Sequence, residues 1–438
     1  MGREVAGGAD AGRGDAGDRE YRRPGWPWRR IIWPPSLPLR QLESAVRFAR
    51  LTHWRGFWPW LTTHAFPSLP VSAGATGMGC IGYPAHPAWE ITNACNLRCI
   101  HCHASSGKPN PDEMTTEEAK RFIDQLARVD EFRMLVYTGG EPLVRPDIFE
   151  LMEHSRTAGL VNVLATNATL ITEEVAFRLR EVGVAGVAVS LDSCDADVHN
   201  RIRRSPEAFA KALEGMRNVR KAGMLLQVNT TAMEHNFDTL LDLIDLANEK
   251  GSSIMLMYQL VPVGRGGEIG TATLDVKANE KLLRYLAEQQ RHISTIVEPV
   301  AGPQYWPFLM EREGKTDARW MKGASRVFHG CAAGRGFVYI KPNGDIWPCP
   351  FVEVSAGNVR ETDFSTIWRE GEVFKTLRSR ETKLEGKCGA CRYRGMCGGC
   401  RGRAMAVTGD LMAEDPSCFI PREVAEGPVG APGARVNV

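Results

Sequence analysis

The middle of the chain alternates short apolar runs with longer amphipathic segments. Six runs rich in branched and aromatic residues predict strands, at residues 88–92, 134–138, 161–166, 186–191, 225–231 and 254–261. The segments between them have helical spacing, as at residues 116–129, which open with Thr and Glu capping residues, and at 206–222, which end before a glycine. Strands that alternate with helices predict βα units around parallel strands. The expected fold is therefore α/β, a partial (β/α)6 barrel over residues 87–270.

The segments that flank this barrel differ from it in composition. Residues 1–20 have almost no large apolar side chain, so we expect a disordered tail. Residues 21–86 form an extension rich in Trp and Arg, with helical apolar spacing in part of it. Such a stretch can lie on a membrane surface or pack on the barrel mouth or a partner protein, and we favour packing.

The C-terminal half predicts two further units and a tail. Residues 271–325 predict a helical bridge, with a helix at 278–291 and then a stretch containing Pro and Trp. Residues 326–424 are rich in cysteine, with short β-type runs at 336–341 and 345–348, and they predict a small cluster domain. Residues 425–438 are rich in Gly, Pro and Ala and predict a flexible tail.

Composition and charge narrow the function classes. A formal net charge of +2 gives no electrostatic reason to expect nucleic acid as a partner. No apolar run reaches the roughly 20 residues of a membrane span, and no secretory signal is visible, so we expect a cytoplasmic protein. Cysteine is the unusual residue, because ten of the twelve lie in two groups. Cys80 and Cys194 fit neither group, and we expect both to be small buried residues.

Three cysteines follow the first predicted strand at the spacing Cys-x3-Cys-x2-Cys, namely Cys95, Cys99 and Cys102. Short spacings in a chain without a secretory signal predict metal ligation rather than disulfides. Three thiolates leave one iron of a four-iron cube open, since closed clusters use four cysteines. The open iron can chelate the amino and carboxylate groups of S-adenosylmethionine, whose reductive cleavage gives methionine and a 5′-deoxyadenosyl radical. A zinc or redox site is the alternative for these cysteines taken alone.

This spacing resembles that of the radical S-adenosylmethionine superfamily, and other motifs fall where that fold would place them. The sequence Gly139-Gly140-Glu141-Pro142 follows the second predicted strand and resembles the family motif that binds the methionine amino group. The resemblance implies that Glu141 accepts a hydrogen bond from the methionine amino group. The glycines allow close approach of a backbone.

The resemblance also implies contacts to the nucleoside. Ser190 and Asp192, after the fourth strand, resemble ribose contacts, and His101 stands where the family has an aromatic residue at the adenine edge. Asn167 occupies the usual Thr-Asn-Gly turn, although Ala168 replaces the glycine. Alternatively, the side chains of Asn167 and Ser190 stabilise backbone turns, and His101 is a surface residue.

Seven more cysteines resemble the SPASM extension of radical enzymes, which holds two auxiliary four-iron clusters. They are Cys331, Cys349, Cys388, Cys391, Cys397, Cys400 and Cys418. The pattern departs from the commonest form at Cys397 and Cys400, which have two rather than three residues between them. Zinc is the alternative for the four cysteines at 388–400, because paired Cys-x2-Cys units often hold it.

The interleaved ligation of that family implies how the seven cysteines divide. One cluster would be closed by Cys388, Cys391, Cys397 and Cys418, whereas Cys331, Cys349 and Cys400 would hold the other with one iron open. That iron could bind substrate, water or a nearby side chain, for which His329 and Asp415 are candidates.

A more particular resemblance lies in motifs of the C-terminal half. Radical enzymes that trim side chains of siroheme-derived tetrapyrroles, including those of heme and d-type heme biosynthesis, have similar sequences at residues 302–305, 357–361, 397–404, 408–410 and 414–416. The implied reaction removes hydrogen from a propionate and then carbon dioxide, and leaves one electron for an auxiliary cluster. Arg265, Arg203 and Arg204 are cations that could pair with substrate carboxylates, and a solvated surface position is the alternative for Arg203 and Arg204.

The sequence thus predicts a radical enzyme with three four-iron clusters and S-adenosylmethionine, acting on a heme-precursor tetrapyrrole. A low-potential electron donor such as ferredoxin or flavodoxin is the expected protein partner. The alternative enzyme is a SPASM maturase of a ribosomal peptide or a quinone cofactor precursor. A non-catalytic iron–sulfur electron carrier is the alternative from another class, but a carrier would not need the Gly-Gly-Glu-Pro motif.

Overall fold

The computed structural model describes residues 86–129, 132, 134–289, 293, 295–312 and 330–427. The predicted tail at residues 1–20, nearly all of the Trp/Arg-rich extension, His329 and Cys80 lie outside these residues. Within the described part of the chain, no helix is long and apolar enough to cross a membrane.

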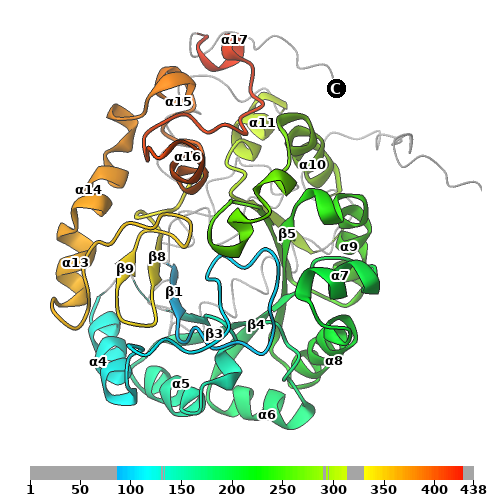
Figure 1. The fold of residues 1–438 in the computed structure, drawn as a ribbon, viewed down its shortest axis with the longest axis vertical. Helices are drawn as coiled ribbons and strands as arrows, with labels where there is room; N and C mark the ends of the chain where they lie inside the picture. The colour runs from blue at the N-terminus through cyan, green and yellow to red at the C-terminus, as the bar shows by residue number, and fades with distance from the viewer. Residues whose placement is uncertain are drawn as a thin grey trace, which may run out of the picture.

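One curved sheet organises the molecule (Figure 1). In the described residues it has nine strands in the order β7-β6-β5-β4-β3-β2-β1-β8-β9, all parallel except the β8–β9 pair. The strands are β1 (His86–Glu90), β2 (Met134–Thr138), β3 (Val161–Thr166), β4 (Val184–Ser190), β5 (Leu225–Ala232), β6 (Ile254–Gln259), β7 (Ile296–Val300), β8 (Phe337–Ile340) and β9 (Ile346–Trp347). The sheet does not close, so the predicted partial α/β barrel is confirmed.

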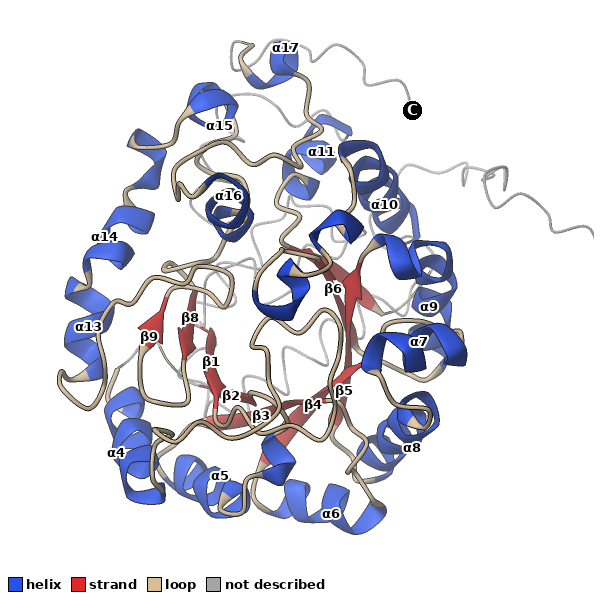
Figure 2. Cartoon of the chain, in the orientation of Figure 1, coloured by secondary structure: helices blue, strands red, loops and turns tan. Residues whose placement is uncertain are grey.

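Helices cover the convex side of the sheet (Figure 2). Those of the barrel are α4 (Thr116–Ala127), α5 (Ile148–Thr157), α6 (Glu173–Glu181), α7 (Ala196–Arg203), α8 (Ala208–Lys221), α9 (Phe237–Glu249), α10 (Val276–Gln289) and α11 (Tyr305–Arg312). The C-terminal region adds α13 (Phe364–Glu370), α14 (Glu372–Arg378), α15 (Gly386–Ala390), α16 (Arg401–Thr408) and α17 (Arg422–Ala425). The predicted capping box forms at the start of α4, where Thr115 and Glu118 exchange hydrogen bonds.

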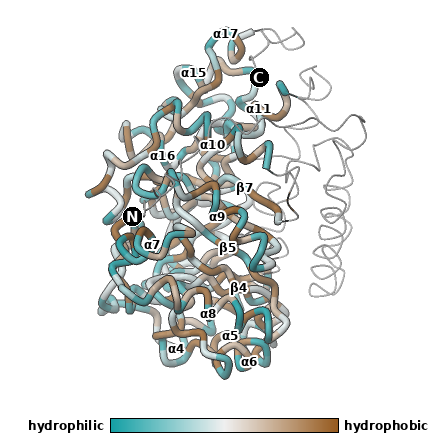
Figure 3. Tube along the Cα trace, turned by 90° about the vertical axis from the view of Figure 1, so that its right-hand side faces the viewer, coloured by the Kyte–Doolittle hydropathy of each residue, from teal (hydrophilic) through white to brown (hydrophobic). Residues whose placement is uncertain are grey.

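The core lies between the sheet and these helices. Trp89 of β1 contacts Phe122 of α4 edge-to-face at 5.2 Å between ring centroids, and Phe122 in turn contacts Phe364 of α13. Figure 3 shows hydrophobic stretches in brown along strands such as β7, while the helices show teal segments. Because the aromatic cluster joins α4 to α13, the C-terminal region shares the barrel's core.

Two features of the sheet extend beyond the six predicted strands. Residues 296–300, within the predicted helical bridge, form β7 at the edge of the sheet, where Pro299 is tolerated because one side of an edge strand needs no hydrogen-bond partner. The predicted short runs after residue 336 form β8 and β9, and β8 pairs in parallel with β1. The cysteine-rich region is therefore joined to the barrel through the sheet itself.

Polar side chains occupy the concave side of the sheet next to β1. Trp89 and Ile91 belong to the core under the helices, so the alternate residue Glu90 faces the enclosed side. Its carboxylate accepts hydrogen bonds from Lys341 Nζ at 2.6 Å and from Tyr339 Oη at 3.1 Å. Burial raises the pKa of Glu90, although Lys341 opposes the shift. The other carboxylate oxygen, Oε1, has no hydrogen-bond partner among the described residues.

Candidate active site and cysteine clusters

The first three cysteines lie in the loop that follows β1, drawn in blue across the concave side of the sheet in Figure 1. A bridge between Ala94 and Gly107 folds this loop back on itself, and Cys95 N donates to Gly107 O at 3.1 Å. The carboxyl ends of parallel strands are where ligands bind in open α/β folds. The cysteine loop, residues 91–113, is therefore positioned at the ligand-binding end of the barrel.

Each of the three sulfurs accepts a hydrogen bond. Leu97 N donates to Cys95 Sγ at 3.4 Å, Ser106 N donates to Cys102 Sγ at 3.4 Å, and Arg203 Nη1 donates to Cys99 Sγ at 3.6 Å. Burial raises the pKa of Cys95 to about 12, and it also raises that of Cys99. A thiolate here needs a nearby cation, which iron supplies, and hydrogen bonds to sulfur are typical of cluster ligands. The donor set fits a three-cysteine iron–sulfur cluster.

The two glycines of the Gly-Gly-Glu-Pro motif make room for the cysteine loop. Gly140 N donates to Thr92 O and Glu141 N donates to Ala94 O, both at 2.8 Å. A Cβ on Gly140 would lie 2.0 Å from Ala94 O, and Gly139 has a φ of +142°. As expected, these glycines allow a close backbone approach, and the partner is the segment just before Cys95.

Glu141 is fully buried between β2 and β3. Its carboxylate accepts hydrogen bonds from Thr166 Oγ1, from Asn167 N and from Leu143 N, at 2.9 to 3.2 Å. Burial outweighs these donors and raises the pKa of Glu141 to about 7. A cation, or a further N–H donor, beside the carboxylate would favour its charged form.

Asn167 connects the end of β3 to the cysteine loop. Its Nδ2 donates to Asn96 Oδ1 at 2.8 Å, while its Oδ1 accepts from Thr169 N and Thr169 Oγ1. The next residue, Ala168, has a φ of +61°, in the left-handed region that glycine occupies at least cost. The replacement of the usual glycine therefore leaves a backbone strain at this turn.

Asp192 lies in a buried ion pair beside Cys99. Arg203 Nε is 2.7 Å from Asp192 Oδ2, and His101 Nε2 is 3.7 Å from the same oxygen. Burial is the largest single influence and opposes ionisation of Asp192, but Arg203, two histidines and a backbone N–H together outweigh it and lower the carboxyl pKa. The His101 side chain is only 9% exposed, so it does not lie on the surface, and burial lowers its pKa to about 4. Ser190 ends β4 nearby and is half-buried.

Two of the three arginines expected to pair with substrate carboxylates contact the cysteine loop instead. Arg265 Nε donates to Cys99 O at 2.9 Å, and its Nη1 donates to Ser106 O at 2.8 Å. Arg203 is buried against Asp192, as described above. Arg204 is exposed and closes α7 with a left-handed backbone. Two of the three guanidiniums thus hold the loop in place.

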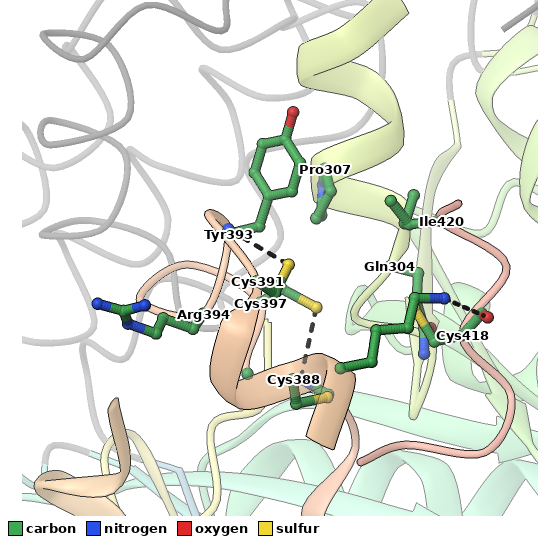
Figure 4. Close-up of a pocket in the computed structure, with 12 residues that line it drawn as sticks. Gln304, Pro307, Cys388, Cys391, Tyr393, Arg394, Cys397, Cys418 and Ile420 are labelled. Carbon is green, nitrogen blue, oxygen red and sulfur yellow. Dashed lines mark hydrogen bonds between the residues drawn. The ribbon is translucent and has the colours of Figure 1, made fainter. Parts of the chain in front are cut away.

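Four of the C-terminal cysteines line one cavity (Figure 4). They are Cys388, Cys391, Cys397 and Cys418, the set implied for the closed auxiliary cluster. Backbone N–H groups donate to three of the sulfurs at 3.4 to 3.5 Å, from Asp415 to Cys388, from Tyr393 to Cys391 and from Gly399 to Cys397. This donor set fits a four-cysteine cluster.

The other three C-terminal cysteines lie together outside that cavity. Cys331 and Cys400 both raise the pKa of the Cys349 thiol by their charge, after the larger effect of burial. Arg403 N donates to Cys400 Sγ at 3.4 Å. The structure thus brings together the two cysteine sets that the family resemblance implied. Among the described residues, no three Cys, His, Asp or Glu side chains converge closely enough for a single metal ion.

Asp415, a candidate ligand for the open auxiliary iron, is fully engaged in the structure. Its carboxylate accepts from Gln304 Nε2 and Cys400 N at 2.7 Å each, and Arg403 Nε is 3.2 Å away. Asp415 connects the two C-terminal cysteine sets, because its own N–H donates to a sulfur of the other set. The remaining unassigned cysteine, Cys194, is half-buried, and its Sγ donates to a backbone carbonyl.

Sequence reasoning missed two buried arginines beside these sets. Arg380 and Arg401 are both 0% exposed. Arg401 directly follows Cys400, which is the one sequence signal that could have drawn attention to it. Sequence reasoning also missed Glu90, Tyr339 and Lys341, whose proximity depends on the pairing of β8 with β1.

Comparisons with known proteins place the chain in a class. Residues 89–258 match the radical SAM superfamily, and residues 331–392 match an iron–sulfur cluster-binding domain, SPASM. The AdoMet-dependent heme synthase of Methanosarcina barkeri is 39% identical over 336 residues, which are 76% of this chain and 95% of the relative. The mycofactocin maturase MftC of Mycobacterium tuberculosis is 33% identical over 339 residues, or 75% of this chain and 81% of the relative.

A solved structure shares the fold. Streptococcus suis SuiB bound to S-adenosylmethionine aligns with a TM-score of 0.59 at 18% identity, covering 77% of each chain. The fold and the three cysteine sets define an iron–sulfur enzyme built on an open α/β barrel. The chain belongs to the radical SAM superfamily and carries a SPASM domain. Its cofactors are a cluster that binds S-adenosylmethionine, auxiliary four-iron clusters and S-adenosylmethionine itself.

Proposed function

We propose that this enzyme decarboxylates or otherwise trims side chains of a heme-precursor tetrapyrrole. The observation that carries the proposal is the 39% identity to an AdoMet-dependent heme synthase over 95% of that relative's length. The C-terminal motifs at residues 302–305 and 397–404 support it, since they resemble those of tetrapyrrole-modifying radical enzymes.

The residues of the cysteine loop and the strand ends would serve the cofactors. When bound, S-adenosylmethionine and the first cluster supply the 5′-deoxyadenosyl radical. Cys95, Cys99 and Cys102 would ligate that cluster, and Cys331, Cys349, Cys388, Cys391, Cys397, Cys400 and Cys418 the auxiliary clusters. Gly139, Gly140, Glu141 and Pro142 would face the methionine end, and Asn167, Ser190, Asp192 and His101 the nucleoside.

Lys341 is the cation we propose for a substrate carboxylate. It lies at the end of β8 on the concave side, is 20% exposed at its side chain, and packs 4.8 Å from the Trp347 ring. A flat aromatic surface beside an ammonium group suits a planar macrocycle with carboxylate arms. Arg265 and Arg203 are bound to the cysteine loop and to Asp192, whereas Lys341 uses only one of its three N–H donors on Glu90 and keeps the others for a substrate carboxylate.

The test is a substrate panel under reducing, anaerobic conditions. The reconstituted enzyme is incubated with S-adenosylmethionine and, separately, with Fe-coproporphyrin and siroheme derivatives, and products are measured by mass spectrometry. Decarboxylation of a propionate to a vinyl group removes carbon dioxide and two hydrogens per side chain. Formation of 5′-deoxyadenosine without a change in any tetrapyrrole would reject the substrate while leaving the radical chemistry intact.

The second candidate is a maturase of a peptide or quinone cofactor precursor. The 33% identity to the mycofactocin maturase favours it. A precursor peptide added to the same panel distinguishes the two, because only one substrate class should raise the yield of 5′-deoxyadenosine above the level without substrate. A low-potential donor, either ferredoxin or flavodoxin, would supply the initiating electron in the cytoplasm under both proposals.

A further inference from the structure

Two buried arginines next to the C-terminal cysteines have no carboxylate partner in the part of the chain that the structure describes. Among the described residues, no Asp or Glu forms an ion pair with Arg380 or Arg401, and both side chains are 0% exposed. Within the described ranges, Arg380 donates only from Nη1, to Cys331 O at 2.8 Å, and its Nε and Nη2 find no hydrogen-bond partner there. A buried, unpaired cation is costly, so a charge-compensating group is expected beside each.

The nearest anionic groups are the cysteine sulfurs of the two auxiliary sets. Arg401 Nη2 is 3.8 Å from Cys388 Sγ, and its Nη1 donates to the carbonyls of Leu411 and Ala413. Arg380 lies between the two sets, because its Nη1 donates to Cys331 O and its Nε packs against Gly398, the residue after Cys397.

The glycines between Cys397 and Cys400 allow this approach. Gly398 and Gly399 both have left-handed backbones, with φ of +67° and +63°. A Cβ on Gly398 would lie 2.7 Å from Arg380 Nε, and one on Gly399 would lie 2.6 Å from Arg401 Nη2. Each arginine thus packs on one glycine of the Cys-Gly-Gly-Cys turn.

The first cysteine set differs in this respect. Its buried arginine, Arg203, is neutralised by Asp192 at 2.7 Å. Arg265, which also contacts that loop, is partly exposed, so water screens its charge. The buried positive charge without a carboxylate is therefore concentrated at the auxiliary sets.

We propose that Arg380 and Arg401 are counter-ions of the auxiliary clusters and raise their reduction potentials. Reduction adds one electron and no proton, so the cluster becomes more negative by one unit of charge. A fixed buried cation stabilises the reduced form more than the oxidised form, and charge near a cluster is one of the established determinants of its potential. Auxiliary clusters with raised potentials accept an electron more readily than the first cluster, whichever substrate releases it.

The test measures potentials directly and uses no substrate. In a chain that carries Cys95→Ala, Cys99→Ala and Cys102→Ala, only the auxiliary clusters remain, and their reduction is followed by electron paramagnetic resonance during a redox titration. We expect Arg380→Met and Arg401→Met each to disfavour reduction about tenfold or more, a shift of about 59 mV to lower potential for one electron.

Three control variants separate charge from packing. Arg380→Lys and Arg401→Lys keep the positive charge, so their potentials should stay near the parent value. Arg128→Met removes the same charge from the surface, where the side chain pairs with Asp363, and should leave the potentials unchanged.

Iron content decides the remaining outcomes. Met variants that bind iron normally and keep the parent potentials would overturn the proposal. Met variants that lose iron while the Lys variants retain it would support a requirement for charge. Loss of iron in both the Met and the Lys variants would show that the shape of the arginine matters, not its charge, and would also overturn the proposal.

Discussion

Replacing Gly140 with alanine tests whether the Gly-Gly-Glu-Pro motif positions the first cysteine set. The added Cβ would lie 2.0 Å from Ala94 O, whereas ordinary contacts begin near 3.4 Å, so the backbone before Cys95 must move by more than 1 Å. That movement breaks the hydrogen bonds from Gly140 N to Thr92 O and from Glu141 N to Ala94 O, each 2.8 Å long. At about 0.5–1.5 kcal/mol each, the two bonds account for about 1–3 kcal/mol.

The expected result is selective loss of the first cluster. The parent chain should bind about twelve irons in three four-iron clusters, and Gly140→Ala about four fewer. Formation of 5′-deoxyadenosine should fall in proportion, while the auxiliary clusters keep their spectroscopic signals. Iron analysis and the 5′-deoxyadenosine assay on anaerobically reconstituted protein measure both effects.

A matched glycine provides the control. A Cβ on Gly270 would lie 3.5 Å from its nearest neighbour, which is an ordinary contact, so Gly270→Ala should keep its iron and its activity. If Gly140→Ala also keeps the full iron content and the parent rate of 5′-deoxyadenosine formation, the argument that this glycine sets the position of the cysteine loop is wrong.

Three further substitutions have defined outcomes. Ala168→Gly should raise the free energy of unfolding by up to about 1 kcal/mol. The substitution relieves a left-handed backbone that costs roughly 1–2 kcal/mol, and this gain exceeds the entropy cost of glycine. A lower melting temperature would contradict this expectation. Since the folded pKa of Glu141 is raised to about 7, protein without S-adenosylmethionine should lose stability as pH rises from about 4.5 to 7. The free energy of unfolding of Glu141→Gln should therefore rise relative to that of the parent by on the order of 3 kcal/mol over that pH interval, and the difference should stay constant at higher pH. A difference in melting temperature that does not change with pH would refute the raised pKa of Glu141. Lys341→Met should destabilise the chain by about 1–3 kcal/mol, because it leaves the buried Glu90 carboxylate without its ammonium partner; adding Glu90→Gln should restore part of the loss, and an additive double variant would show that the two residues do not interact.

The strands and the cysteine groups could be predicted from sequence because each is a local pattern. The six apolar runs of the barrel form β1 to β6, and the cysteine loop follows β1 as expected. The strand β7 could not be predicted, since Pro299 argues against a strand unless the strand is known to lie at an edge.

The roles of buried charges depended on contacts that no local pattern reveals. Arg265 lies in a Gly-rich turn after β6, where an exposed arginine is the ordinary expectation, yet its guanidinium reaches two carbonyls of a loop more than a hundred residues earlier. Lys341 and Glu90 are likewise far apart in sequence, and only the β1–β8 pairing brings them together. Long-range pairing of this kind is set by the whole fold.

The pairing of β1 with β8 also has a consequence for how the chain is made. His86 aligns with Phe337 and Trp89 with Ile340, so the strand that leads into the cysteine loop completes its hydrogen bonds only after the C-terminal region has left the ribosome. Until then β1 presents an open edge, which is a site for wrong pairing and aggregation. Contacts so distant in sequence fold slowly. Correct maturation of the first cysteine set is therefore coupled to synthesis of the last quarter of the protein, and truncation that removes β8 should harm a site more than two hundred residues earlier in the chain.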